Sequence, residues 1–257
     1  MRRRGFTPGA IREFCDRVGV TKVESESDPA LLEWCVREEL NRTALRRMAV
    51  LDPVKLLIEN FEGTRDVELP NNPLDEAAGT RKVPFSKEVW IDRADFMEVP
   101  EKKFFRLAPD REVRLRGACI VKCTGVEKDA DGKITTIRCT WDEGSWGGNP
   151  SDGRKVKGTI HWVDVATGVK AEVRLYDRLF TVPDPLRDGS DGFLKYLNPD
   201  SLKTVTAYVE PALAAAASGE RFQFERTGYF VVDSKDSTPG APVFNRTVTL
   251  KDGYKPA

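Results

Sequence analysis

Apolar residues in the first 45 positions recur at helical spacing in two blocks. Thr7 followed by Pro8 predicts the start of a helix, because threonine caps the first turn and proline fits the first helical position. Asp28-Pro29 predicts a second helix in the same way. The apolar sides of the two predicted helices consist of Ile11, Phe14, Cys15 and Val18, and of Leu31, Leu32, Cys35 and Leu40. The pattern of the second helix ends between Asn41 and Arg47.

From residue 48 the spacing changes to short runs rich in β-branched and aromatic residues, which predict strands. The runs span 83–85, 88–91, 113–123, 134–141, 156–163, 169–175, 205–209, 222–224, 229–232 and 243–250. Asp-Gly or Thr-Gly pairs at 131–132, 152–153, 167–168 and 188–189 predict turns between them. Residues 62–80 and 183–192 have loop composition. Many short strands at regular spacing predict a mainly β fold, as a barrel or a sandwich.

The charges balance, with 41 Lys and Arg against 41 Asp and Glu in 257 residues. This balance argues against a uniformly basic, non-specific nucleic-acid binder such as a general DNA-binding protein. A local cluster remains at 101–122, with seven basic and three acidic residues. The chain has no apolar run of membrane-spanning length and no secretory signal. Five scattered cysteines, an odd number, favour a reducing compartment, and we predict a cytoplasmic protein without membrane contact.

Several kinds of catalytic or metal site are excluded by composition. His161 is the single histidine, so motifs that need two histidines are absent, and we expect it to be structural. No Gly-rich phosphate loop occurs. Cys119 and Cys123 lack a second Cys or His pair, which favours core thiols over zinc ligands. The residues of this chain therefore predict no catalytic site, no metal site and no cofactor site.

Arg114 and Arg116 are the most suggestive pair of polar residues. They lie two apart in a predicted strand, so both point to one face while Val113 and Leu115 point to the other. Two planar guanidiniums on one face suit recognition of phosphate or of base edges. The alternative is a solvated strand face whose arginines pair with acids such as Asp110 and Glu112. The strand alone does not decide between the two interpretations.

Several long stretches resemble glutaminyl-tRNA synthetase, a class I aminoacyl-tRNA synthetase, in the region after its catalytic domain. They are residues 2–17 (RRRGFTPGAIREFCDR), 48–55 (MAVLDPVK), 89–96 (VWIDRADF), 152–162 (DGRKVKGTIHW), 174–180 (RLYDRLF) and 242–248 (PVFNRTV). The resemblance covers nearly the whole chain. It implies a small helical connecting subdomain over 1–45 and two anticodon-binding β-barrels. The proximal barrel is expected over 46–97 and 207–257, with the distal barrel, 98–206, inserted into it.

The resemblance also implies which residues contact the anticodon. Arg46 and Gln223 match the contacts of the central uridine, Arg114 and Arg116 those of the first base, and Arg106 that of the third base. Asn41 matches a position on the anticodon-stem side, and Lys103 stands where the family pattern has glutamine. Phe105 stands where that pattern has lysine, so the lysine contact is not carried over. We expect Arg114→Ala to relax selectivity at one anticodon position.

The implied partner is the anticodon stem-loop of glutamine tRNA, bound by a monomer. The resemblance further implies that ATP and magnesium bind in a catalytic domain that this chain lacks, so the chain alone is expected not to aminoacylate. Met1 directly before three arginines suggests a piece cut from a longer protein. Two alternatives remain open: the barrels of a glutamyl-tRNA synthetase, and a self-standing β-barrel interaction module.

Overall fold

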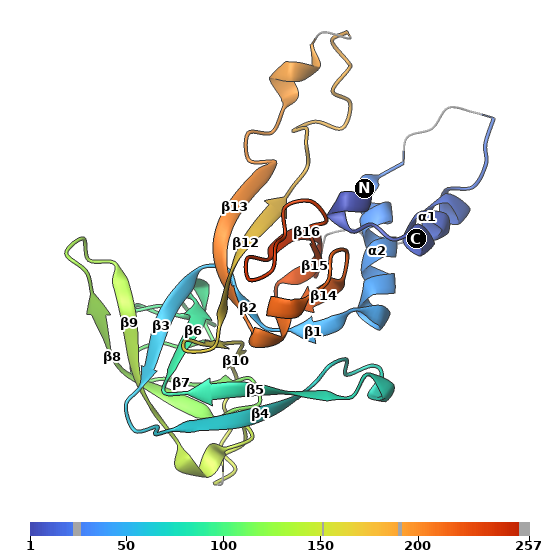
Figure 1. The fold of residues 1–257 in the computed structure, drawn as a ribbon. Coiled ribbons are helices and arrows are strands. Elements are labelled where there is room, and N and C mark those ends of the chain that lie inside the picture. The colour runs from blue at the N-terminus through green and yellow to red at the C-terminus, as the bar shows by residue number, and fades with distance from the viewer. Residues whose placement is uncertain (23–26, 151, 190–191, 252–257) are drawn as a thin grey trace.

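The computed structural model describes residues 1–22, 27–150, 152–189 and 192–251. A short turn of 3-10 helix, η1 (Arg2–Arg4), precedes helices α1 (Pro8–Val18) and α2 (Pro29–Thr43), which lie beside a largely β body (Figure 1). Both predicted helix starts are confirmed. The hydroxyl of Thr7 accepts a bond from the backbone N–H of Ala10, at 3.2 Å, and the carboxylate of Asp28 accepts one from that of Ala30, at 2.8 Å.

The first of two large sheets, sheet A, contains both the start and the end of the β region. Its strand order is β1 (Leu45–Arg47), β14 (Arg221–Phe224), β15 (Gly228–Val232), β16 (Val243–Thr249), β12 (Val169–Tyr176), β13 (Leu202–Val209) and β2 (Ala49–Val50). The two edge strands, β1 and β2, are separated only by Met48. The sheet therefore curls until its edges meet, which makes it a barrel. Phe224 stacks on Phe230 in its core, with ring centroids 4.2 Å apart.

Sheet B closes in the same way. Its order is β10 (Thr159–Ile160), β7 (Glu112–Leu115), β8 (Ile120–Lys128), β9 (Ile134–Trp141), β3 (Pro53–Ile58), β6 (Glu88–Asp92) and β11 (Val163–Asp164). Only His161 and Trp162 separate its edge strands, β10 and β11. Trp162 is fully buried and packs edge-on against Phe85, with ring centroids 4.8 Å apart. The predicted mainly β fold with two barrels is confirmed.

A hairpin of β4 (Thr64–Pro70) and β5 (Thr80–Ser86) forms a third, two-stranded sheet that runs below β1 and β14 in Figure 1. The prediction of a loop over 62–80 was wrong for 64–70, because β4 buries Val67 and Leu69 between exposed polar residues, while 71–75 lie outside helices and strands. The predicted strand over 113–123 is two strands, since Gly117 adopts a left-handed turn with φ of 70°. Residues 183–189 and 192 lie outside helices and strands, as predicted, while 190–191 lie outside the described residues. The remaining short 3-10 turns are η2 (Glu76–Ala78), η3 (Arg93–Asp95), η4 (Glu143–Ser145), η5 (Phe193–Tyr196) and η6 (Pro211–Ala215).

The strand pairing divides the chain differently from the boundaries expected from the resemblance. Strands β3 and β6 were expected in the proximal barrel, but they pair with β9 and β11 in sheet B. Strands β12 and β13 were expected in the distal barrel, but they pair with β16 and β2 in sheet A. One barrel is inserted into the other, as expected, but it runs from β3 to β11. These partners are far apart in sequence, so a local pattern cannot identify them.

Buried polar contacts and a ring stack join the two barrels. Trp90 on β6 stacks on Tyr208 on β13, with ring centroids 4.7 Å apart and planes 10° apart. Glu210, which follows β13, accepts two bonds from Arg81 on β5, at 2.7 and 3.0 Å. Its carboxylate also accepts a 2.9 Å bond from the backbone N–H of Met48, between β1 and β2. These contacts fix how sheet A packs against sheet B and the β4–β5 hairpin.

Asp233, just after β15, holds the N-terminal turn onto sheet A. Its buried carboxylate accepts bonds from Arg3 at 2.7 and 3.0 Å, and from Asn245. Burial opposes ionisation, but these bonds and two backbone N–H groups outweigh it and hold the pKa of Asp233 well below its usual value. A depressed carboxyl pKa gives stability above the unfolded pKa, about 3.9, that is lost as the pH falls through the folded value.

We therefore expect Asp233→Asn to make the folded protein less stable at neutral pH and its stability less dependent on pH. Urea unfolding between about pH 5 and pH 2 should show a smaller loss of unfolding free energy for the variant than for the original chain. Asp66→Asn is the control, because Asp66 is exposed and lies 3.9 Å from Lys82. Equal slopes for Asp233→Asn and the original chain would contradict the role given to Asp233.

Candidate nucleic-acid interface

Two of the predicted site residues, Arg46 and Gln223, lie opposite each other where β1 pairs with β14 in parallel. The guanidinium of Arg46 is buried and donates to the backbone oxygens of Ala44, at 2.6 Å, and Asn41, at 2.7 Å. It also donates to the side-chain oxygen of Asn41 at 3.1 Å, and the hydroxyl of Tyr229 donates to that same oxygen at 3.2 Å. The structure thus brings Asn41, Arg46 and Gln223 together around Tyr229.

Burial in this cluster shifts the pKa values of two of its side chains. Burial lowers the pKa of Arg46, and the neighbouring Tyr229 and Glu225 partly offset that effect. Burial likewise raises the pKa of the Tyr229 hydroxyl, against the effect of Arg46. Gln223 is half-buried, and within the described residues its side-chain amide has no hydrogen-bond partner. A free amide offers both a donor and an acceptor, the combination that the edge of a uridine requires.

The turn that follows β14 connects this cluster to sheet B. The carboxylate of Glu225 lies 2.9 Å from the guanidinium of Arg116, which follows β7. Next to it, Arg226 donates two 2.6 Å bonds to the buried carboxylate of Asp95. Asp95 also lies 3.2 Å from Nε of Arg106. Residues 223–226 therefore bring Arg46, Arg106 and Arg116 to one junction between the barrels.

Arg226 lies in the candidate interface, and the sequence did not point to it. Its backbone is left-handed, with φ of 66°, which turns its side chain toward sheet B. Burial opposes its charge, but Asp95 outweighs burial and raises the pKa of Arg226. Its position three residues after Gln223, in a turn between two strands, is the only sequence signal, and it is a weak one.

His161, which was expected to be structural, is buried and has a polar neighbour at each ring nitrogen. It is buried between Arg226, which lies 3.1 Å from Nδ1, and Asp92, whose carboxylate lies 3.0 Å from Nε2. Because arginine only donates, Nδ1 must accept, and the proton belongs on Nε2 facing Asp92. Burial opposes ionisation of Asp92, but His161 together with the backbone N–H groups of Leu51 and Asp52 outweighs burial and lowers the pKa of Asp92. Asp92, Asp95 and His161 lie within reach of one metal ion, but Arg226 already bonds to two of the three.

Arg114 and Arg116 have different partners. Val113 and Leu115 are buried, as predicted, and Arg114 is half-buried on the opposite face of β7. Arg114 donates to the backbone oxygen of Gly148 and, at 3.3 Å, to that of Val156. Arg116 instead reaches across to Glu225 on sheet A. The guanidiniums of Arg114 and Arg116 therefore do not form a single binding group.

The acids named in the alternative interpretation do not pair with these arginines. Glu112 accepts two bonds from Arg154, at 3.0 and 2.9 Å. Among the described residues, Asp110 forms no ion pair. Lys103 is exposed, with a left-handed backbone at φ of 76°, and lies in the loop before Arg106. Lys103 is therefore close in sequence to Arg106 of the junction, but no hydrogen bond or ion pair within the described part of the chain fixes its side chain.

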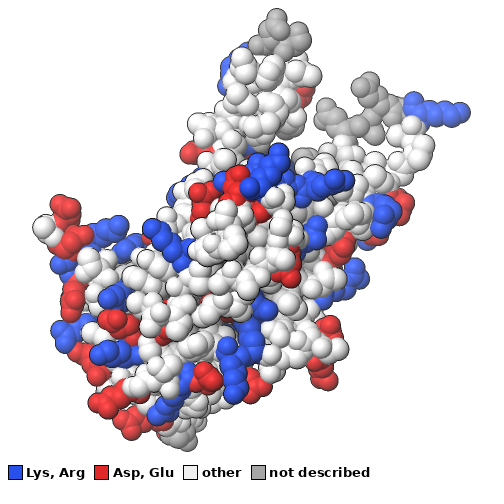
Figure 2. Space-filling view, in the orientation of Figure 1, with Lys and Arg blue, Asp and Glu red and all other residues white. Residues whose placement is uncertain are grey.

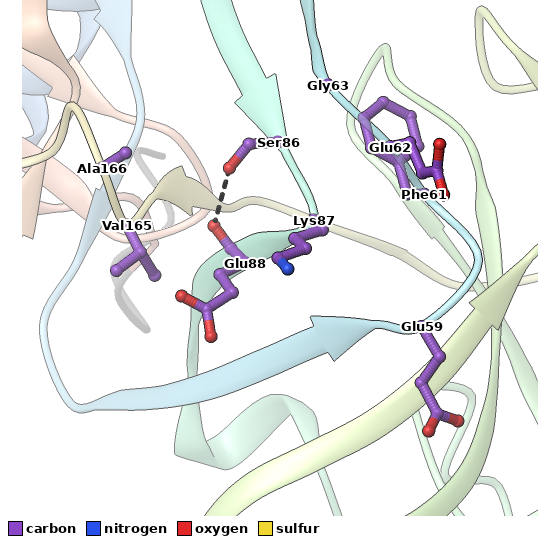
Figure 3. Close-up of a pocket in the computed structure, with 9 residues that line it drawn as sticks. All are labelled: Glu59, Phe61, Glu62, Gly63, Ser86, Lys87, Glu88, Val165 and Ala166. Carbon is purple, nitrogen blue, oxygen red and sulfur yellow. Dashed lines mark hydrogen bonds between the residues drawn. The ribbon is translucent and has the colours of Figure 1, made fainter.

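A pocket of about 590 Å³ lies away from these residues (Figure 3). Its lining consists of Glu59, Phe61, Glu62, Gly63, Ser86, Lys87, Glu88, Val165 and Ala166. Three carboxylates against one lysine disfavour phosphate, and none of the predicted site residues lines it. This pocket is therefore not the candidate interface.

The remaining predictions concern cysteines and membranes. Cys119 and Cys123 are buried in the core of sheet B, as predicted for core thiols, and burial raises the pKa of Cys119 to about 12. No helix in the described part of the chain is long and apolar enough to cross a membrane.

Known proteins match this chain over almost its whole length. Two models of the anticodon-binding domain of class I tRNA synthetases (E and Q) match residues 44–142 and 159–233, together more than half of the chain. The chain is 54% identical over 255 residues to the glutamine--tRNA ligase of Photobacterium profundum, and 55% identical over 256 residues to that of Vibrio parahaemolyticus. Each match covers 99% of this chain and 46% of the relative, so the chain spans about half the length of these relatives.

The glutamine--tRNA ligase of Escherichia coli K12 is 54% identical over the same extent. These names favour the glutamine enzyme over the glutamate alternative and over a self-standing interaction module. The chain therefore belongs to the family of anticodon-binding domains of class I tRNA synthetases (E and Q), and it is similar over almost its whole length to glutamine--tRNA ligases.

Proposed function

We propose that this chain binds the anticodon loop of glutamine tRNA and selects it by its bases. The observation that carries the proposal is the junction at residues 223–226, where Gln223 adjoins Arg46 while Glu225 and Arg226 contact Arg116 and Asp95. Unpaired loops expose base edges, which side chains read by hydrogen bonds and stacking. Arginines suit acceptor edges, and the free amide of Gln223 suits a base with both donor and acceptor.

The charge distribution supports selective binding at this junction over attraction to a broad basic face. Figure 2 shows basic and acidic side chains interspersed over the visible face of the molecule. With a net charge of zero, long-range attraction to RNA is weak. Local contacts must therefore supply most of the selectivity.

We further propose that the chain supplies recognition to a longer ligase and contributes no bond-making group of its own. It spans under half of the length of its relatives. On this proposal, ATP, magnesium and the transfer of glutamine belong to the remainder of such a protein. The isolated chain then binds the anticodon stem-loop as a monomer and does not aminoacylate.

We expect Arg116→Ala to relax selectivity at one anticodon position. Its side chain is 40% exposed at the junction, and one good base contact discriminates by about 1–3 kcal/mol, or about 5- to 150-fold. Fluorescence anisotropy with anticodon stem-loops that differ at one base measures the ratio of dissociation constants. Arg138→Ala is the matched control, because Arg138 is 47% exposed and pairs with Glu59 and Glu127, which are not residues of the junction. Equal selectivity loss in both variants, or in neither, would reject a base contact by Arg116.

A further inference from the structure

Phe105 is unusual among the phenylalanines of this chain. All thirteen lie in described residues, and Phe105 is the only exposed one, with 52% of its surface accessible. Exposing an aromatic ring to water forfeits the stabilisation that its burial would give. A ring left in solvent beside a candidate RNA interface is thus a candidate contact.

The backbone that carries Phe105 is held firmly against β10 and β7. Gly158 lies so close that a Cβ atom there would come within 2.0 Å of the backbone oxygen of Phe105. The guanidinium of Arg111 donates to the backbone oxygen of Phe104 at 3.1 Å. The backbone N–H of Arg114 donates to the backbone oxygen of Gly158 at 3.0 Å, which ties this segment to the strand of the candidate interface. The ring is therefore presented from a fixed backbone.

Phe105 lines a pocket of about 380 Å³ whose other walls are largely basic. The charged lining residues are Arg106, Arg111, Lys122, Lys155 and Lys157 against Asp110 and Glu112. Arg154 neutralises Glu112 through two hydrogen bonds. Within the described residues, Arg111, Lys122, Lys155 and Lys157 form no ion pair. Asp110 is the one lining carboxylate left to offset these four cations, so the pocket carries a net positive charge.

The ammonium of Lys157 lies over the Phe105 ring, 4.8 Å from its centroid. An aromatic face beside a cation suits a nucleotide, whose base stacks on the ring while its phosphate pairs with the lysine. The volume lies near the lower end of the range for small-ligand pockets, which suits one nucleotide better than a base-paired stem.

We propose that Phe105 is a stacking platform for one unpaired nucleotide of the bound RNA, whose phosphate lies among Arg111, Lys122, Lys155 and Lys157. This inference rests on the proposed function, because it assumes that the chain binds an RNA loop. Stacking tolerates any base, so Phe105 contributes affinity and orients the loop, while the neighbouring Arg106 supplies the hydrogen-bonding readout.

The test uses the whole chain and anticodon stem-loops that carry the fluorescent base 2-aminopurine at one loop position at a time. Stacking on an aromatic ring quenches this base. We expect binding of the original chain to quench it strongly at one position, and Phe105→Leu to abolish that quenching. Affinity should fall about 5- to 150-fold in Phe105→Leu and recover in Phe105→Tyr, which restores the ring. Circular dichroism should give the same melting temperature for all three chains, because the ring is exposed.

The outcomes separate this inference from the function on which it rests. Selective RNA binding with equal affinity and quenching in Phe105→Leu and the original chain would overturn the stacking platform and leave anticodon reading intact. A similar loss of affinity in Phe105→Leu and Phe105→Tyr would also overturn the stacking platform, because stacking requires only the ring, which tyrosine keeps. If the original chain showed no preference among anticodons, the proposed function itself would fail.

Discussion

Replacing Gln223 with alanine should remove most of the discrimination at the central anticodon base while leaving the fold intact. The chain contains no other glutamine, and the side chain of this one lies half-buried opposite Arg46 with no hydrogen-bond partner among the described residues. Because this amide forms no hydrogen bond within the described protein, its removal should not lower the free energy of unfolding. The loss should appear as about a 5- to 150-fold smaller ratio of dissociation constants between loops with and without uridine at that position.

Isothermal titration with two stem-loops that differ only in the central base measures this ratio. Thr204→Ala serves as the control, because Thr204 is exposed on β13 and the substitution also removes a small polar group from sheet A. Urea unfolding of Gln223→Ala should match that of the original chain. If Gln223→Ala weakened binding to every RNA equally, the residue would act on general affinity and would not read a base.

Glu210→Gln should destabilise the protein more than any substitution at the candidate interface. The carboxylate is 1% exposed and lies between Arg81, which is 8% exposed, and Arg47, which is 11% exposed. Breaking a buried charge pair leaves an uncompensated cation and costs about 3–5 kcal/mol. Glutamine keeps the size and one acceptor for the backbone N–H of Met48, so we expect a loss of about 3 kcal/mol in unfolding free energy.

Equilibrium urea unfolding at neutral pH measures this loss. Glu127→Gln is the matched control, because Glu127 is 50% exposed, lies 3.7 Å from Arg138 and should cost at most about 1 kcal/mol. Since Glu210 joins sheet A to the β4–β5 hairpin, its variant should also begin to unfold there. Similar stabilities for Glu210→Gln and Glu127→Gln would show that the junction between the barrels does not depend on this carboxylate.

Local sequence signals predicted the helices well and the sheets only in part. Capping residues and proline at the first helical position depend on a few adjacent residues, so Thr7-Pro8 and Asp28-Pro29 marked both helix starts. Strand β4 was missed because its acidic and proline residues outnumber Val67 and Leu69, the two that it buries. The division into barrels depends on pairings such as β3 with β9, which no local pattern encodes.

For the candidate site, the resemblance supplied residues that the pattern of the chain could not. An arginine in a strand, such as Arg116, has the same local signature whether it meets solvent or RNA. The acids that position these arginines were missed for the same reason. Asp95 and Glu225 contact Arg226 and Arg116 only because the turn after β14 approaches sheet B, which is a property of tertiary structure.

The most direct test of anticodon reading is a set of dissociation constants for the original chain with stem-loops of identical stem and different anticodon. We predict tightest binding to the anticodon of glutamine tRNA, about 5- to 150-fold weaker binding for each well-read base that is changed, and weaker binding of all loops as salt rises. Equal affinity for loops with unrelated anticodons would contradict the account.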